Sequence, residues 1–66
     1  MTKREYLNSL NHDLSYYNSF IDKKKFDEKL WHHGEQLSYR TVVDKASEIL
    51  TELRTIETLK GYKPWK

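Results

Sequence analysis

The sequence predicts an all-α protein, built as an antiparallel helical hairpin of two long helices with a short intervening helix. Three observations lead to this fold class. Two stretches carry apolar residues at alternating spacings of three and four, the pattern of a helix that packs along its length on another helix. The 66 residues include only two glycines and one proline, Gly34, Gly61 and Pro64. Thr2 and Ser38 are suited to cap the two long helices.

The first helix is expected over residues 3–21. Thr2 and Glu5 have the spacing of a capping box, in which each side chain accepts a hydrogen bond from the backbone N–H of the other residue. Met1 and Tyr6 occupy the two positions of a hydrophobic staple. The apolar seam of this helix is Leu7, Leu10, Leu14, Tyr17 and Ile21, widened by Tyr6 and Phe20.

A short helix is expected over residues 23–33. The seam of the first helix does not continue there, and the next apolar pair, Phe26 and Leu30, is out of phase with it. We therefore predict a break near Asp22, with Gly34 as the left-handed residue that ends the short helix. One long, kinked helix with the same ends is the alternative.

The third helix is expected over residues 39–60. Leu37 and Val42 are placed to staple its start, while Gly61 and Pro64 are placed to end it. Its seam is Tyr39, Val42, Ala46, Ile49, Leu53 and Ile56, with Val43 and Leu50 beside it and Leu59 at the other margin.

Two further points of architecture concern strands and assembly. Residues 37–43 also alternate between apolar and polar, which is compatible with a short strand, but no partner strand is evident. The apolar faces of two long helices are too wide for one hairpin to cover, so either the short helix folds back or a second copy covers the remainder. We expect a homodimer. Residues 1–61 form a single domain, and residues 62–66 form a basic, aromatic tail.

Composition argues against several classes of protein. The chain has no cysteine, which excludes disulfides and thiolate chemistry. It contains no nucleophile-elbow serine and no glycine-rich phosphate loop, so we expect no enzyme and no cofactor. No apolar run is long enough for a membrane span or a signal peptide, and we therefore expect a cytoplasmic protein.

The three histidines are His12, His32 and His33. Glu28 and His32 are four residues apart, a spacing that can chelate a metal on a helix. A second spaced pair is missing, and adjacent histidines on a helix point about 100° apart. The sequence therefore predicts a solvated polar patch and no metal site.

Protein recognition is the favoured function. Aromatic residues make up 14% of an otherwise polar chain, and tryptophan and tyrosine are enriched at interface hot spots. The aromatic residues that lie off the seams are Tyr16, Trp31, Tyr62 and Trp65. An acidic stripe on the outer face of the third helix, Asp44, Glu48 and Glu52, could meet a basic partner or simply be solvated.

Nucleic-acid binding is the alternative function. Lysines form one run at Lys23, Lys24 and Lys25, and they recur beside aromatic residues of the tail at Lys63 and Lys66. In an antiparallel hairpin these two groups lie at opposite ends, about 30 Å apart. The net charge of +2 is balanced and does not by itself indicate a nucleic-acid binder.

Short segments resemble a known family. Residues 1–10 (Met-Thr-Lys-Arg-Glu-Tyr-Leu-Asn-Ser-Leu), residues 21–26 (Ile-Asp-Lys-Lys-Lys-Phe) and the group Ala46, Leu50, Glu52 and Leu53 are similar to the Hha/YmoA group of small helical nucleoid modulators. The Asp-His-Arg-Leu-Ala-Glu-Leu run of that group is replaced here by Ser-Glu-Ile-Leu-Thr-Glu-Leu. The size and composition also resemble small accessory proteins of bacteriophages and mobile elements, which implies a regulator or inhibitor that binds a larger host protein.

Overall fold

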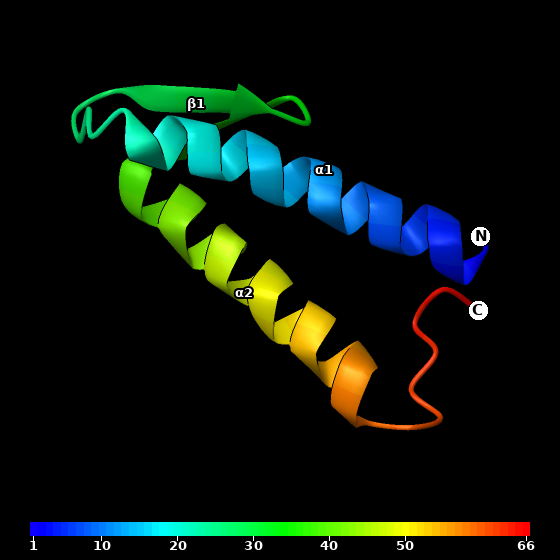
Figure 1. The fold of residues 1–66 in the computed structure, drawn as a ribbon. Helices are drawn as coiled ribbons and strands as arrows, with labels where there is room; N and C mark the ends of the chain where they lie inside the picture. The colour runs from blue at the N-terminus through cyan, green and yellow to red at the C-terminus, as the bar shows by residue number, and fades with distance from the viewer.

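The computed structural model describes residues 1–66 as two α-helices joined by a two-stranded antiparallel sheet. The elements are α1 (Lys3–Asp22), β1 (Lys29–His32), β2 (Glu35–Ser38) and α2 (Tyr39–Thr58). The two helices form a V that is closed beside the sheet and open toward the chain termini (Figure 1). The molecule measures 41 × 22 × 14 Å. The prediction of an all-α fold is wrong, because the chain is an α+β protein.

The short helix predicted over residues 23–33 is absent, and a β-hairpin replaces most of it. Leu30 lies opposite Leu37, and His32 lies opposite Glu35. Along β1, Leu30 and His32 are half-buried while Trp31 is exposed, which is the alternation of a strand with one covered face. Of the strand considered at residues 37–43, only the first two residues are in β2, and their partner strand is β1, where a helix was expected.

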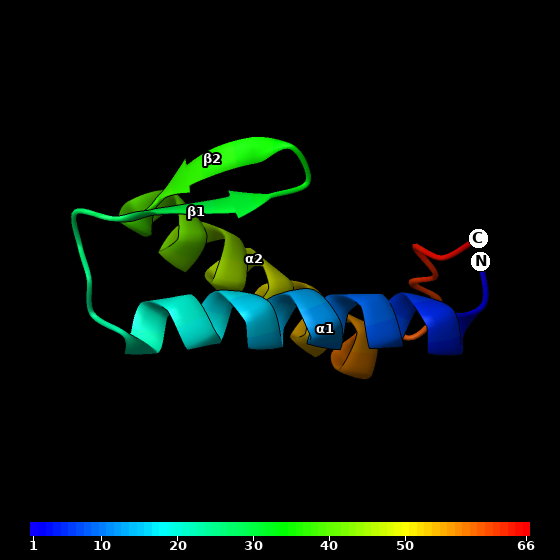
Figure 2. The same cartoon turned by 90° about the horizontal axis from the view of Figure 1, so that it is seen from above.

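The turn between the strands consists of His33 and Gly34, whose φ angles are +52° and +77°. A two-residue turn in which both central φ angles are positive matches the right-handed twist of a β-hairpin. Gly34 is left-handed, as predicted, but it reverses the chain between two strands and does not end a helix. Figure 2 shows the hairpin lying along one side of the two helices.

The ends of α1 follow local chemistry. The capping box is confirmed, since the Glu5 N–H donates to the Thr2 hydroxyl at 3.2 Å and the Thr2 N–H donates to the Glu5 carboxylate at 2.9 Å. At the other end, the Tyr39 hydroxyl donates to the Ile21 carbonyl at 2.9 Å. This bond satisfies a carbonyl of the last turn, where α-helices lack internal donors.

The second helix is also capped at its start. The N–H of Thr41 donates to the Ser38 hydroxyl at 3.3 Å. The helix ends at Thr58, two residues earlier than predicted. Gly61 follows with φ +90° in a turn that the Tyr62 N–H closes on the Leu59 carbonyl, so the glycine serves this turn and not the helix cap. Neither α1 nor α2 has a stretch apolar enough to cross a membrane.

The core lies at the closed end of the V. Its buried residues are Tyr17 and Phe20 of α1, Leu37 of β2, and Val42 and Ala46 of α2. Three of the five, Tyr17, Val42 and Ala46, belong to the predicted seams, and Phe20 lies on the face that widens the first seam, so the phase of both helices is confirmed. Farther along the V, seam residues are only half-buried, among them Leu7, Leu53 and Ile56. The outlying residues Val43, Leu50 and Leu59 are exposed.

Candidate functional site

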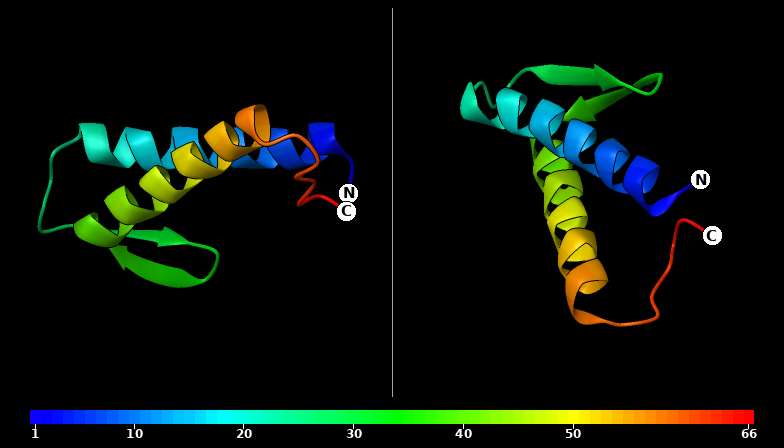
Figure 3. Two further views of the ribbon diagram at one scale, coloured as in Figure 1. Left: turned by 90° about the horizontal axis from the view of Figure 1, so that it is seen from below. Right: turned by 45° about the vertical axis from the view of Figure 1, so that its right-hand side comes forward.

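The C-terminal residues 59–66 return across the open end of the V, so that the C-terminus lies beside the N-terminus (Figure 3). The ring centroids of Trp65 and Tyr6 are 6.2 Å apart. The Lys3 ammonium lies 5.8 Å from the centre of the Trp65 ring, within reach of a cation–π interaction. The tail predicted at residues 62–66 is therefore packed on α1.

One carboxylate joins both helices and this tail. Glu52 of α2 accepts hydrogen bonds from the hydroxyls of Tyr6 at 2.5 Å and Tyr62 at 2.8 Å. Three of the predicted partner-binding residues, Glu52, Tyr62 and Trp65, are thus joined to other parts of the chain at the open end of the V. Of the predicted acidic stripe, Asp44 and Glu48 remain exposed, while Glu52 is turned to the tyrosines.

These bonds predict that the tail is released at high pH. The hydrogen bond to Glu52 raises the pKa of Tyr6 to about 12, and it also raises the pKa of Tyr62. Because these pKa values are higher in the folded state, their stabilising contribution is complete below about pH 10 and is lost as the pH rises toward 12. The ultraviolet absorbance of tyrosinate should appear at lower pH in Glu52→Gln than in the wild type. Glu57→Gln is the matched control, and equal titrations of all three proteins would contradict the assignment.

An open groove lies between the first half of α1 and the last turns of α2, toward the open end of the V. Its volume is about 430 Å³, and its walls are Lys3, Leu7 and Asn11 from α1 and Leu53, Ile56 and Glu57 from α2. Leu7, Leu53 and Ile56 give the groove its apolar side chains, and Lys3, Asn11 and Glu57 make the rest of its lining polar. Lys3 on one wall and Glu57 on the other give the two walls opposite charges.

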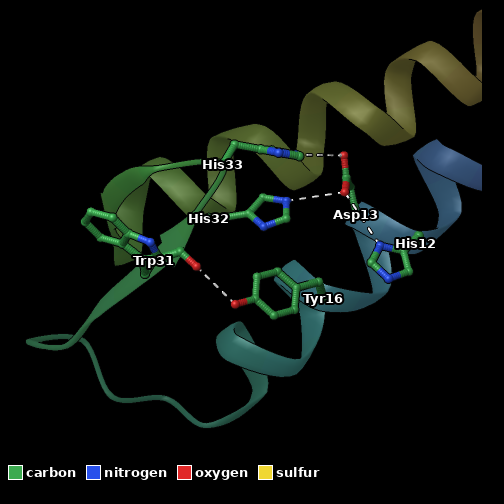
Figure 4. Close-up of polar contacts among 6 residues, drawn as sticks. All are labelled: His12, Asp13, Tyr16, Trp31, His32 and His33. Atoms are coloured by element: carbon green, nitrogen blue, oxygen red, sulfur yellow. Dashed lines mark hydrogen bonds and ion pairs between the residues drawn. The ribbon is translucent and has the colours of Figure 1, made fainter.

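A second cluster, the His–Asp cluster, lies where the β-hairpin meets α1 (Figure 4). It consists of Asp13 from α1 with His32 and His33 from the end of β1 and the turn. His32 Nε2 is 3.3 Å from Asp13 Oδ1, and His33 Nε2 is 3.8 Å from Asp13 Oδ2. His12 lies beside the cluster, with Nδ1 3.8 Å from Asp13 Oδ1.

Aromatic rings hold His32 in place. Its ring centroid is 4.7 Å from that of Tyr16 and 5.2 Å from that of Tyr17, and its side chain is only 13% exposed. The Tyr16 hydroxyl donates to the Trp31 carbonyl at 3.1 Å, which ties β1 to α1. Burial, followed by the nearby Asp13 charge, raises the pKa of Tyr17. The indole of Trp31 points away from the cluster and is exposed (Figure 4).

This cluster could not be predicted from the sequence, because it depends on the turn between β1 and β2. On a helix, His32 and His33 would diverge, but the left-handed turn brings both imidazoles to one carboxylate. Glu28, which the helical spacing paired with His32, instead forms an ion pair with Lys25 at 3.7 Å. Nothing in the sequence around Asp13 predicts its contact with the histidines, because this contact depends on how the hairpin docks on α1.

The two lysine groups do not form one surface. Lys23, Lys24 and Lys25 lie in the connection after α1 at the closed end, whereas Lys63 and Lys66 lie in the tail at the opposite end (Figure 1). Lys24 adopts a left-handed conformation with φ +55°. This separation matches the arrangement expected from the sequence.

Comparisons with protein-family models, curated proteins and solved structures find no match to this chain. The resemblance to the Hha/YmoA group therefore stays a likeness of short segments. The features of the molecule that bear on its function are the groove, the β-hairpin and the His–Asp cluster.

Proposed function

We propose that the chain is a small, non-enzymatic protein-binding module of the cytoplasm, which works as a homodimer and regulates or inhibits a larger protein. The observation that supports this proposal is the large solvent-accessible surface of the chain. A monomer of 8.0 kDa is expected to expose about 4,450 Å², whereas this chain exposes 5235 Å². The excess of about 800 Å² equals the area that one partner buries in a standard protein–protein interface.

The groove supports the proposal that the first partner is a second copy of the chain. Its apolar side chains lie outside the core, and the core holds only five buried residues. A core this small leaves a domain of this size marginally stable. Covering the groove would bury further apolar side chains and so stabilise the chain. A two-fold axis brings equivalent surfaces together. It can therefore set Lys3 of one protomer opposite Glu57 of the other, which satisfies both charges.

The hairpin end supports binding of the larger protein. Trp31 is 62% exposed on the outer face of β1, and Phe26 is 68% exposed in the preceding loop. The hydrogen bond from Tyr16 to the Trp31 carbonyl holds the backbone of β1 against α1 at this position, so the strand that carries the indole is fixed. Since Trp65 packs on Tyr6, Trp31 is the tryptophan that we expect to anchor the target.

Affinity capture from the source cells, with nucleic acid assayed in the same eluate, tests the proposal. Trp31→Ala should weaken binding of the captured protein at least about 30-fold, the loss typical of an interface hot spot. This loss should depend weakly on salt. The variant with Lys23, Lys24 and Lys25 replaced by alanine, and the matched tryptophan control Trp65→Ala, should retain the target.

The same experiment can contradict the proposal. A module that binds nucleic acid would show steep salt dependence, which the triple-lysine variant would flatten by up to about three units of slope. That outcome, combined with unchanged binding by Trp31→Ala, would replace protein recognition by nucleic-acid binding.

A further inference from the structure

We infer that Asp13, His32 and His33 form a binding site for a divalent transition-metal cation of the Zn²⁺ class. Imidazole nitrogens and carboxylate oxygens are ligands that Zn²⁺ takes in proteins. One ligand atom from each of the three residues lies within 4.8 Å of the other two. Three protein ligands with water at the fourth position are a common arrangement for this cation.

The distances are close to those that coordination requires. Ligand atoms about 2.0–2.1 Å from a tetrahedral metal ion are about 3.3–3.4 Å from one another. His32 Nε2 is 3.3 Å from Asp13 Oδ1, while His33 Nε2 is 3.8 Å from the other carboxylate oxygen, Asp13 Oδ2. The three ligand atoms, with one oxygen from Asp13, lie within 4.8 Å of one another. The His33 side chain is 72% exposed, so its imidazole can shift to coordination distance without disturbing the core.

Two of the three ligands are held in place by packing. His32 is enclosed by Tyr16 and Tyr17 and lies on the covered face of β1. Asp13 is fixed on α1, and its side chain is only 25% exposed. A preorganised site loses little conformational freedom on binding, which favours affinity. His12 is 80% exposed and does not belong to the set whose ligand atoms all converge.

A bound cation would connect α1 directly to the turn of the hairpin. Asp13 and His32 are 19 residues apart in the chain, so this link would restrain a segment that includes the whole connection after α1. A ligand that binds only the folded chain stabilises it by mass action. The inference is independent of the groove and of Trp31, because neither contributes a ligand.

Isothermal titration of the untagged chain with Zn²⁺ alone, together with thermal unfolding, tests the site. We expect one equivalent of Zn²⁺ to bind and to raise the Tm by several degrees at saturation. His33→Asn removes one imidazole while placing Asn-Gly in the turn, the favoured pair for this hairpin geometry. This variant should fold at least as well as the wild type without metal and should bind Zn²⁺ at least tenfold more weakly. Asp13→Asn should lose affinity to a similar degree.

His12→Asn is the matched control, since it removes a neighbouring imidazole that is not a ligand. It should retain both the affinity and the rise in Tm. The inference is overturned if the wild type shows no saturable binding, or if His33→Asn and Asp13→Asn bind Zn²⁺ as tightly as the wild type does.

Discussion

Phe20→Ala should leave the chain without a cooperative unfolding transition. Phe20 is 6% exposed in a core of only five residues, and its ring packs 5.8 Å from that of Tyr39. Truncating a buried phenylalanine costs about 3–5 kcal/mol. A domain of this size has about 3–5 kcal/mol of stability in total. Far-ultraviolet circular dichroism during heating measures the effect.

Phe26→Ala is the matched control, because it removes the same side chain from an exposed position. Phe26 is 68% exposed, although its ring touches that of Tyr39 at 4.7 Å. This variant should keep a cooperative transition close to that of the wild type. If Phe20→Ala melted like the wild type, the core would not lie at the closed end of the V.

Leu53→Asp should separate the proposed dimer. Leu53 lines the groove that we expect a second copy to cover, so a carboxylate there would be buried without a partner. We expect the dissociation constant of the dimer to rise at least about 30-fold, the effect of losing a hot-spot residue. Sedimentation velocity at micromolar concentration measures the shift from dimer to monomer. Circular dichroism of the same sample checks that the helices persist.

Leu50→Asp is the control for this substitution. Leu50 is on the same helix, is 54% exposed and does not line the groove. The dimer should survive this change. A dimer that is broken by Leu50→Asp and unaffected by Leu53→Asp would mean that the helices associate through the outer face of α2.

The two long helices could be predicted because their signals are local. The capping box at Thr2 and the spacing of the seams act within one or two turns, and Tyr17, Phe20, Val42 and Ala46 are buried in the phase that the seams indicate. The end of α2 was less predictable. The helix ends at Thr58, and Gly61 lies in the turn that follows. A glycine near a helix end is compatible with either a helix cap or such a turn.

The β-hairpin could not be read from the same signals. Phe26 and Leu30 are four residues apart, which also fits one face of a helix. The turn has histidine, and not the more typical asparagine or aspartate, before Gly34. The pairing of Leu30 with Leu37 favours the hairpin over a helix. In the hairpin Leu30 is covered, whereas in a short, isolated helix it would be exposed.

The candidate sites depend on contacts between distant segments. Asp13 contacts His32 only because β1 docks on α1, so a helix at residues 23–33 would not bring these residues together. Glu52 looked like part of an outer acidic stripe, but the returning tail places Tyr62 against it. Trp31 was identified as an exposed aromatic residue from its position off the seams, and it is exposed on the strand that replaces the expected helix.

We propose that a second copy of the chain covers the open groove. Light scattering on a size-exclusion column tests it most directly, with the wild-type chain measured across the micromolar range. The chain mass of 8.0 kDa predicts a particle of about 16 kDa, which should fall toward the monomer mass in Leu53→Asp. A wild-type mass near 8.0 kDa at every concentration would contradict the claim.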